Sequence, residues 1–267
     1  MLQILIVVFR EILEISLIVG ILTAATKHIV NRNKYIALGL IIGCIGSLIL
    51  AFFTDLISQS LDGVGQEIFN GFVLLSAAIM ISWTVIWMQK HAKSLSGEFK
   101  ELGNSIKQGK KPPIALLMVV ALSVLREGAE IVLFSYGAYV SGVDIANILM
   151  GISLGIFMGT ALGFALYLGL LKVFGKYFFK VTTVILVLLA CGVTSQAFGM
   201  WTSSGILSPI IEELWDSSEI ISQASVFGQI LNIFTGYIEK PSAIQIIAYL
   251  TNLIIIISGL NIYKKNK

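Results

Sequence analysis

The chain has 267 residues, of which 57% are hydrophobic and 12% are charged, and its formal net charge is +3. Soluble globular domains contain about 25% charged residues, so this composition excludes a soluble domain and indicates an all-α membrane protein. The sequence shows neither a nucleic-acid-binding motif nor a glycine-rich phosphate loop, so nucleic acid is not an expected partner.

Apolar stretches long enough to cross a bilayer, about 20 residues each, recur along the chain. The first carries charges where a signal peptide would be uniformly apolar, so we expect it to be a retained span. The seven predicted spans are 2–25, 35–55, 67–88, 113–137, 147–171, 181–201 and 242–262. They predict a single transmembrane domain over 1–267, with an external loop at 202–240 before the seventh helix.

The charges of the connecting segments predict the orientation. The connections after the first, third and fifth spans and the C-terminal tail hold 15 of the 18 Lys and Arg residues. The other side is acidic and includes Glu67, Asp216 and Glu219. By the positive-inside rule, the N-terminus lies outside and the C-terminus lies in the cytoplasm of a multi-pass cell-membrane protein. We expect the basic segment 90–111 to be a cytoplasmic loop attracted to anionic lipid.

Two predicted spans carry the same charged motif. The first span contains Arg10, Glu11 and Glu14, and the fourth contains Arg126, Glu127 and Glu130. Each ionised group costs about 2.5–3.5 kcal/mol at mid-bilayer, and such residues usually mark a substrate or ion pathway. At 100° per residue, the three side chains of each motif share one narrow stripe of their helix. Gln3 lies on the same stripe of the first span, toward its outer end.

The two motifs predict an internal repeat. A constant offset of 116 maps Arg10 onto Arg126, and it also pairs Asn31 with Asn147, Gly39 with Gly155, Gly43 with Gly159 and Ser47 with Gly163. Repeat 1 covers about 1–90 and repeat 2 about 113–201, with three spans each, and an odd number of spans inverts the second copy. The predicted fold is a 3+3 inverted-topology repeat plus one C-terminal helix, with small residues at its helix contacts.

A twofold axis in the membrane plane would bring the four glutamates together near its middle. With both arginines the cluster has a net charge of −2, which a multivalent cation would neutralise. The donors are hard oxygens, which suit Mg, Ca, Mn and ferric iron, and donor type alone does not choose among them. Both histidines, His28 and His91, fall in predicted cytoplasmic loops, so a di-iron Glu-x-x-His site is not expected. The pattern favours a transporter over an enzyme, and helix stapling by Arg–Glu pairs is the structural alternative.

The Arg-Glu-x-x-Glu motifs in the first and fourth spans resemble the signature of the oxidase-dependent iron permeases, which include the fungal high-affinity iron permease and the bacterial EfeU-type permeases. The segments Trp83–His91 and Leu214–Ser218 resemble the bacterial branch. The external Asp216-Ser217-Ser218-Glu219 resembles an acidic Asp-x-Ser-Glu motif of the fungal proteins. Ile12 departs from the pattern, because many members have glycine at that place in the first motif.

The resemblance implies import of iron, delivered as Fe³⁺ after external oxidation, with no cofactor beyond the transported ion. Glu11, Glu14, Glu127 and Glu130 would be the metal ligands, and Arg10 and Arg126 would supply supporting charge. Asp216, Glu219 and Glu67 could collect cations at the outer face. An extracytoplasmic oxidase or peroxidase and an iron-delivery protein are the implied partners. The alternatives are a permease for another cation, such as Mn²⁺ or Pb²⁺, and a non-transporting receptor or scaffold.

Overall fold

In the computed structural model, which describes residues 1–267 except 28, 62, 92–94, 169–173 and 266–267, the chain is helical and the described part contains no strand. The helices are α1 (Leu2–Ala25), α2 (Arg32–Gln59), α3 (Val64–His91), α4 (Leu95–Lys107), α5 (Ile114–Val140), α6 (Ile145–Tyr167), α7 (Phe174–Ser203), α8 (Val226–Thr235) and α9 (Ala243–Lys265). His28 lies outside the described residues, and so does the side chain of His91.

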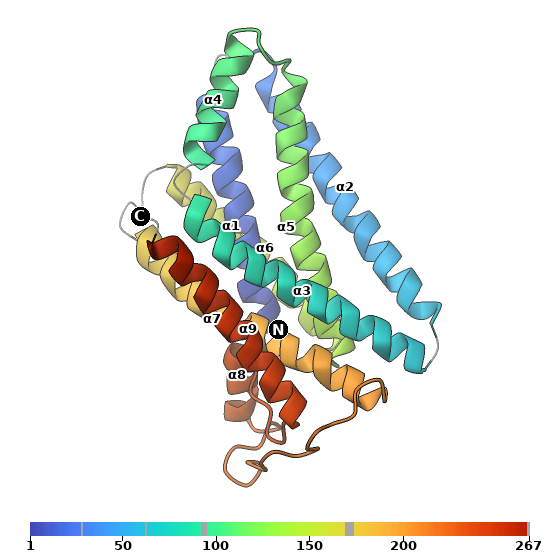
Figure 1. Ribbon diagram of the computed structural model, residues 1–267. Coiled ribbons are helices and arrows are strands. Elements are labelled where there is room, and N and C mark those ends of the chain that lie inside the picture. Colours follow the sequence, from blue (N-terminus) through green and yellow to red (C-terminus); the bar gives the residue numbers. More distant parts are fainter. Residues whose placement is uncertain (28, 62, 92–94, 169–173, 266–267) are drawn as a thin grey trace.

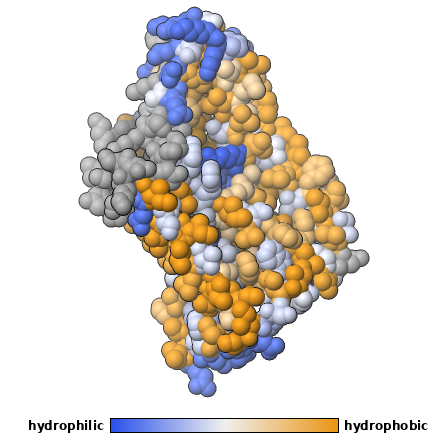
Figure 2. Space-filling view, in the orientation of Figure 1, coloured by the Kyte–Doolittle hydropathy of each residue, from blue (hydrophilic) through white to orange (hydrophobic). Residues whose placement is uncertain are grey.

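Five of these helices are long and apolar enough to cross a membrane, namely α2, α3, α6, α7 and α9. α1 and α5 have similar lengths, 24 and 27 residues, but each carries the three charges of its motif. Figure 2 shows apolar side chains over much of the middle of the visible face and hydrophilic side chains gathered at its two ends. Length, composition and surface together describe a multi-pass membrane protein.

Two helix pairs are packed through glycine, α1 with α6 and α2 with α5. A Cβ atom at Gly43 would lie 2.6 Å from the Cβ of Val124, and one at Gly155 would lie 2.8 Å from the Cβ of Val8. Small residues let helix backbones approach this closely in lipid, where tight packing stabilises helix association. Contact positions rise together along both partners, so the helices of each pair are parallel: Gly151 meets Ile4, Gly155 meets Val8 and Gly159 meets Ile12, while Gly39 meets Val120 and Gly43 meets Val124.

The register of these pairs corrects the ungapped alignment of the two repeats. An offset of 116 pairs Val8 with Val124 and Gly39 with Gly155. In the structure Gly155 meets Val8, but the glycine that meets Val124 is Gly43, so Gly43 is the equivalent of Gly155. The glycine rows therefore correspond at an offset of 112, one helical turn away. Six residues (26–31) separate α1 from α2, whereas four (141–144) separate α5 from α6. The predicted pairing of Asn31 with Asn147 is wrong, since Asn31 precedes α2 and Asn147 lies inside α6.

Helices α3, α7 and α9 form a second part of the bundle. Asn252 of α9 connects them, because its side chain donates to Thr194 Oγ1 at 2.8 Å and accepts from Ser82 Oγ at 3.2 Å. Trp201, near the end of α7, donates to the carbonyl of Ile68, near the start of α3, at 3.1 Å. These contacts make α3 and α7 antiparallel and place α3 against the site described below.

Helix α4 corrects the expectation of a simple loop between the third and fourth spans. Its apolar side chains Phe99, Leu102 and Ile106 are buried in a cluster that includes Leu22 of α1 and Leu116 of α5. The spacing of three and four residues places them on one helical face. The helix therefore covers the adjoining ends of α1 and α5, as Figure 1 shows.

Candidate metal site

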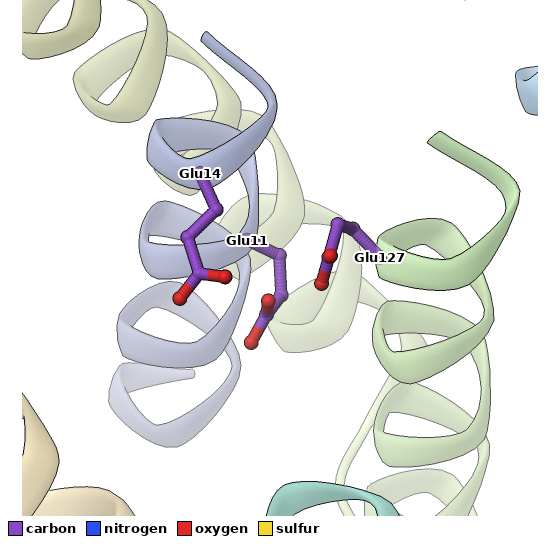
Figure 3. A group of neighbouring side chains, drawn as sticks. All are labelled: Glu11, Glu14 and Glu127. Atoms are coloured by element: carbon purple, nitrogen blue, oxygen red, sulfur yellow. The ribbon is translucent and has the colours of Figure 1, made fainter. Parts of the chain in front are cut away.

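Helices α1 and α5 pack against each other and bring carboxylates from both motifs together. One oxygen each of Glu11, Glu14 and Glu127 lies within 4.8 Å of the others, and among the described residues this is the group that could hold a metal ion. Figure 3 shows the three side chains directed into one space between the helices. All three residues are buried. The predicted convergence of the motifs is therefore seen in the structure for three of the four glutamates.

In the first motif, Arg10 forms short ion pairs with both glutamates. Arg10 Nη1 lies 3.2 Å from Glu11 Oε1, and Arg10 Nε lies 2.9 Å from Glu14 Oε1. The Arg10 side chain is only 6% exposed, so this cation is part of the interior. Spacings of one and four residues on a helix allow a single guanidinium to reach both carboxylates.

The second motif has the same sequence spacing but a different geometry. Arg126 Nε lies 3.9 Å from Glu127 Oε1 and 3.7 Å from Glu130 Oε1, and its side chain is 35% exposed. The guanidinium lies over the ring of Trp87, 4.8 Å from the ring centroid, a distance typical of cation–π contact. The two arginines, which the sequence treats as equivalent, thus have different environments.

Thr84 of α3 accounts for part of this difference. Its hydroxyl donates to Glu130 Oε1 at 2.7 Å and accepts from Arg126 Nη2 at 3.1 Å. Glu130 is therefore held by α3 and lies outside the group of three close carboxylates. Thr84 was not among the residues predicted from the sequence. The only sign of it there is that a hydroxyl residue stands three positions before Trp87 in an apolar span.

Several carboxylate oxygens at the site lack donors. Oε2 of Glu11, Glu127 and Glu130 is buried and accepts no hydrogen bond from the described residues. Buried polar atoms are normally satisfied, so orphaned oxygens call for an explanation such as an ion. An oxygen-only set of this kind fits a hard cation, and no thiolate or imidazole of the described residues belongs to the group.

The three acids predicted to collect cations at the outer face do not join this group. Asp216 pairs with Lys240, with 2.8 Å between Oδ2 and Nζ, and its Oδ1 accepts from the backbone and hydroxyl of Ser218. The hydrogen bond from Lys240 lowers the pKa of the Asp216 carboxyl below its usual range. Glu219 and Glu67 are exposed. The predicted role of these acids in collecting cations remains untested, and Asp216 already has a cation beside it.

Replacing Thr84 with valine tests the link between α3 and the second motif. The change keeps the shape but leaves buried Glu130 Oε1 without its donor, and we expect a loss of about 1–3 kcal/mol in unfolding free energy. Thermal unfolding of the purified protein measures it. Thr54→Val, at a buried threonine whose hydroxyl donates to the carbonyl of Leu50 in its own helix, and Thr84→Ser are the comparisons. An unchanged Thr84→Val protein would contradict the assigned hydrogen bond.

The fold and the site together define a multi-pass helical membrane protein with a buried carboxylate cluster between two helices. The model of the iron permease FTR1 family matches residues 1–265, and the chain belongs to that family. It is 28% identical over 252 residues to the ferrous iron permease EfeU of Escherichia coli O157:H7, covering 93% of this chain and 91% of the relative. It is 26% identical to the EfeU of Yersinia pestis, covering 93% and 89%. No solved structure matches the chain. These relatives are named as permeases, so the class is transporter and not enzyme.

Proposed function

We propose that this protein imports iron across the cell membrane through the carboxylate cluster. The observation that carries the proposal is the group of buried oxygens from Glu11, Glu14 and Glu127 within 4.8 Å of one another. A cation there would neutralise carboxylates whose charge the two arginines only partly balance. Glu130, beside Glu127 on α5, is proposed as the fourth ligand, reached when its bond to Thr84 opens. Family membership supports iron as the ion.

The proposed topology has seven spans, in which α1 and α5 join the five uniformly apolar helices. The N-terminus lies outside and the C-terminus in the cytoplasm, and α1–α3 and α5–α7 form the two inverted repeats. The pairing of α1 with α6 and of α2 with α5 supports this arrangement, because exchanging the repeats converts one pair into the other. The odd number of spans per repeat makes the members of each such pair parallel, as their contacts require.

We propose Fe³⁺, supplied by an external oxidation step, as the imported species. Carboxylate oxygen favours the harder ferric ion, although the names of the relatives specify ferrous iron. An external oxidase or peroxidase and a delivery protein would be the partners. Uptake measured with ascorbate, which keeps iron ferrous, against uptake with an added ferroxidase separates the two species. Faster uptake under ascorbate would overturn the ferric assignment and leave the iron assignment standing.

Uptake of radiolabelled iron by a host that lacks its own iron transport tests the function. We expect Glu11→Ala and Glu130→Ala to lower the uptake rate at least tenfold, because a lost carboxylate costs more than about 1.4 kcal/mol of ion binding. Glu101→Ala, at an exposed glutamate of α4, is the matched control, and immunoblots of membranes verify equal insertion. Wild-type uptake in both cluster variants would sink the proposal. If Mn²⁺ or Pb²⁺ competes fully and the protein shows no preference for iron, that ion rather than iron would be the proposed substrate.

A further inference from the structure

A cavity of about 420 Å³ lies near the cluster, at the end of the bundle where α1 begins and α5 ends. Its walls come from α1, α3, α5, α7, α8, the segments on either side of α8, and the start of α9. Gln3, in its lining, precedes Glu11 by eight residues on α1, about 12 Å along the helix axis. Phe134, also in its lining, follows Glu130 by one turn of α5. The cavity and the carboxylates are thus successive positions along the same two helices.

Amide side chains supply most of the polar groups of the cavity, and the lining that the structure describes contains no ionisable side chain. The five amides come from α1, α7, the segment before α8, α8 and α9: Gln3, Gln196, Gln223, Asn232 and Gln245. Several are held in place: Gln196 Oε1 accepts from Ser141 at 3.2 Å, and Asn232 Nδ2 donates to the carbonyl of Tyr237 at 2.8 Å. The result is a neutral polar chamber with oriented dipoles and no fixed countercharge.

Close contacts at three glycines shape this chamber. Gly192 of α7 meets the backbone of Gly236, which ends α8 in a left-handed conformation with φ 72°. Gly199 of α7 faces the Nε2 atom of Gln245, and an added Cβ would overlap it. A side chain at Gly192 would push α8 away from α7, whereas one at Gly199 would displace the end of the Gln245 side chain. The close approach of these elements therefore keeps the amides directed into one space.

Apolar side chains of the core also line the cavity. Leu74, Phe134 and Leu189 are each no more than 3% exposed, and Phe134 lies one turn of α5 from Glu130. These side chains offer no hydrogen-bond acceptor, so an ion that moves past them toward the carboxylates would have to give up part of its hydration shell. The amide groups are therefore the part of the cavity suited to an ion that still has its water.

We propose that this cavity is a second cation site, which holds a hydrated metal ion by hydrogen bonds from its bound waters to amide oxygens. Metal-bound water donates hydrogen bonds, and each amide oxygen has two acceptor positions. Six waters at about 30 Å³ each need about 180 Å³, so a hydrated ion fits in the cavity. The absence of charge in its lining makes the binding weak enough for release. This inference extends the proposed iron import but is testable without it.

Hexaamminecobalt(III) is the probe, because its six ammine ligands donate hydrogen bonds as bound water does and do not exchange for carboxylate oxygen. Calorimetric titration of the purified protein at physiological ionic strength measures binding. We expect Gln196→Leu and Gln223→Leu each to weaken it about fivefold, the value of one hydrogen bond. Met200→Leu, an apolar change in the same lining, should bind like the wild type. Glu11→Gln should also retain the probe, since the carboxylates lie beyond the apolar side chains.

Three results would overturn the second site: no binding by the wild type, equal binding by both amide variants, or loss of binding in Glu11→Gln. Binding that survives both amide changes would place the probe on the exposed acidic segment instead. Thermal unfolding checks that the variants are folded. Failure of iron import with intact probe binding would reject the proposed function and keep this site, and the reverse pair of results would reject only this site.

Discussion

Arg10→Met is expected to remove most of the folded protein from the membrane, whereas Arg126→Met should leave it there. Arg10 is buried and lies within 3.2 Å of both Glu11 and Glu14. Breaking a buried pair by removing one partner costs about 3–5 kcal/mol, because the other charge is left uncompensated. Methionine keeps much of the side-chain volume, so the loss would come from charge rather than from a cavity.

Arg126→Met is the matched comparison. Its guanidinium is 3.7–3.9 Å from its glutamates and is 35% exposed, so its ion pairs are longer and less enclosed than those of Arg10, and we expect their loss to destabilise the fold less. Size-exclusion profiles of fluorescently tagged protein, extracted in mild detergent, measure the folded fraction of each variant. Equal loss in both variants would show that the two motifs are equivalent and would contradict the asymmetry of the site.

The second large effect is expected at the glycine contacts. A Cβ at Gly43 would lie 2.6 Å from Val124 Cβ and 2.8 Å from the carbonyl oxygen of Ala121. The backbone of α5 cannot move aside as a side chain tip could, so Gly43→Ala must separate α2 from α5. Overpacking of this kind costs about 1–3 kcal/mol or more, and thermal unfolding in detergent measures it.

The control for this change is Gly97→Ala in α4, where an added Cβ meets nothing within 4 Å. There we expect an unchanged or slightly higher unfolding temperature, because alanine favours helix over glycine by about 1 kcal/mol. Gly159→Ala, 2.8 Å from the carbonyl oxygen of Phe9, should behave like Gly43→Ala. A Gly43→Ala protein as stable as the Gly97→Ala protein would contradict the close pairing of α2 and α5.

Helix positions were predictable because they depend on local hydropathy. The first predicted span, 2–25, coincides with α1, and the charged stripe of each motif follows from helical periodicity alone. The convergence of Glu11 and Glu127 was also predictable, because the expected twofold relation between the two motif helices turns their charged stripes toward each other. Within the loop predicted over 202–240, the structure has a short helix, α8, at Val226–Thr235.

Features that depend on the packing of distant segments were not predictable. Nothing in the spacing of Arg126 and Glu130 shows that Thr84 lies between them, since α3 is reached only through the tertiary fold. Two residues of the four-residue shift of the glycine rows come from the unequal connections and the other two from the unequal helix ends beside them, which an ungapped comparison cannot represent. Helix α4 was missed because its apolar residues, Phe99, Leu102 and Ile106, are sparse in a basic segment and find their partners on α1 and α5.

The glycine pairing has a mechanical consequence for the carboxylates. Glu11 and Glu14 belong to the close pair of α1 and α6, while Glu127 belongs to that of α2 and α5. The proposed ligands therefore face each other across the boundary between two helix pairs. A rotation of one helix pair against the other would change every distance between Glu127 and the two glutamates of α1 at once. The strength of ion binding and the angle between the two helix pairs are therefore coupled.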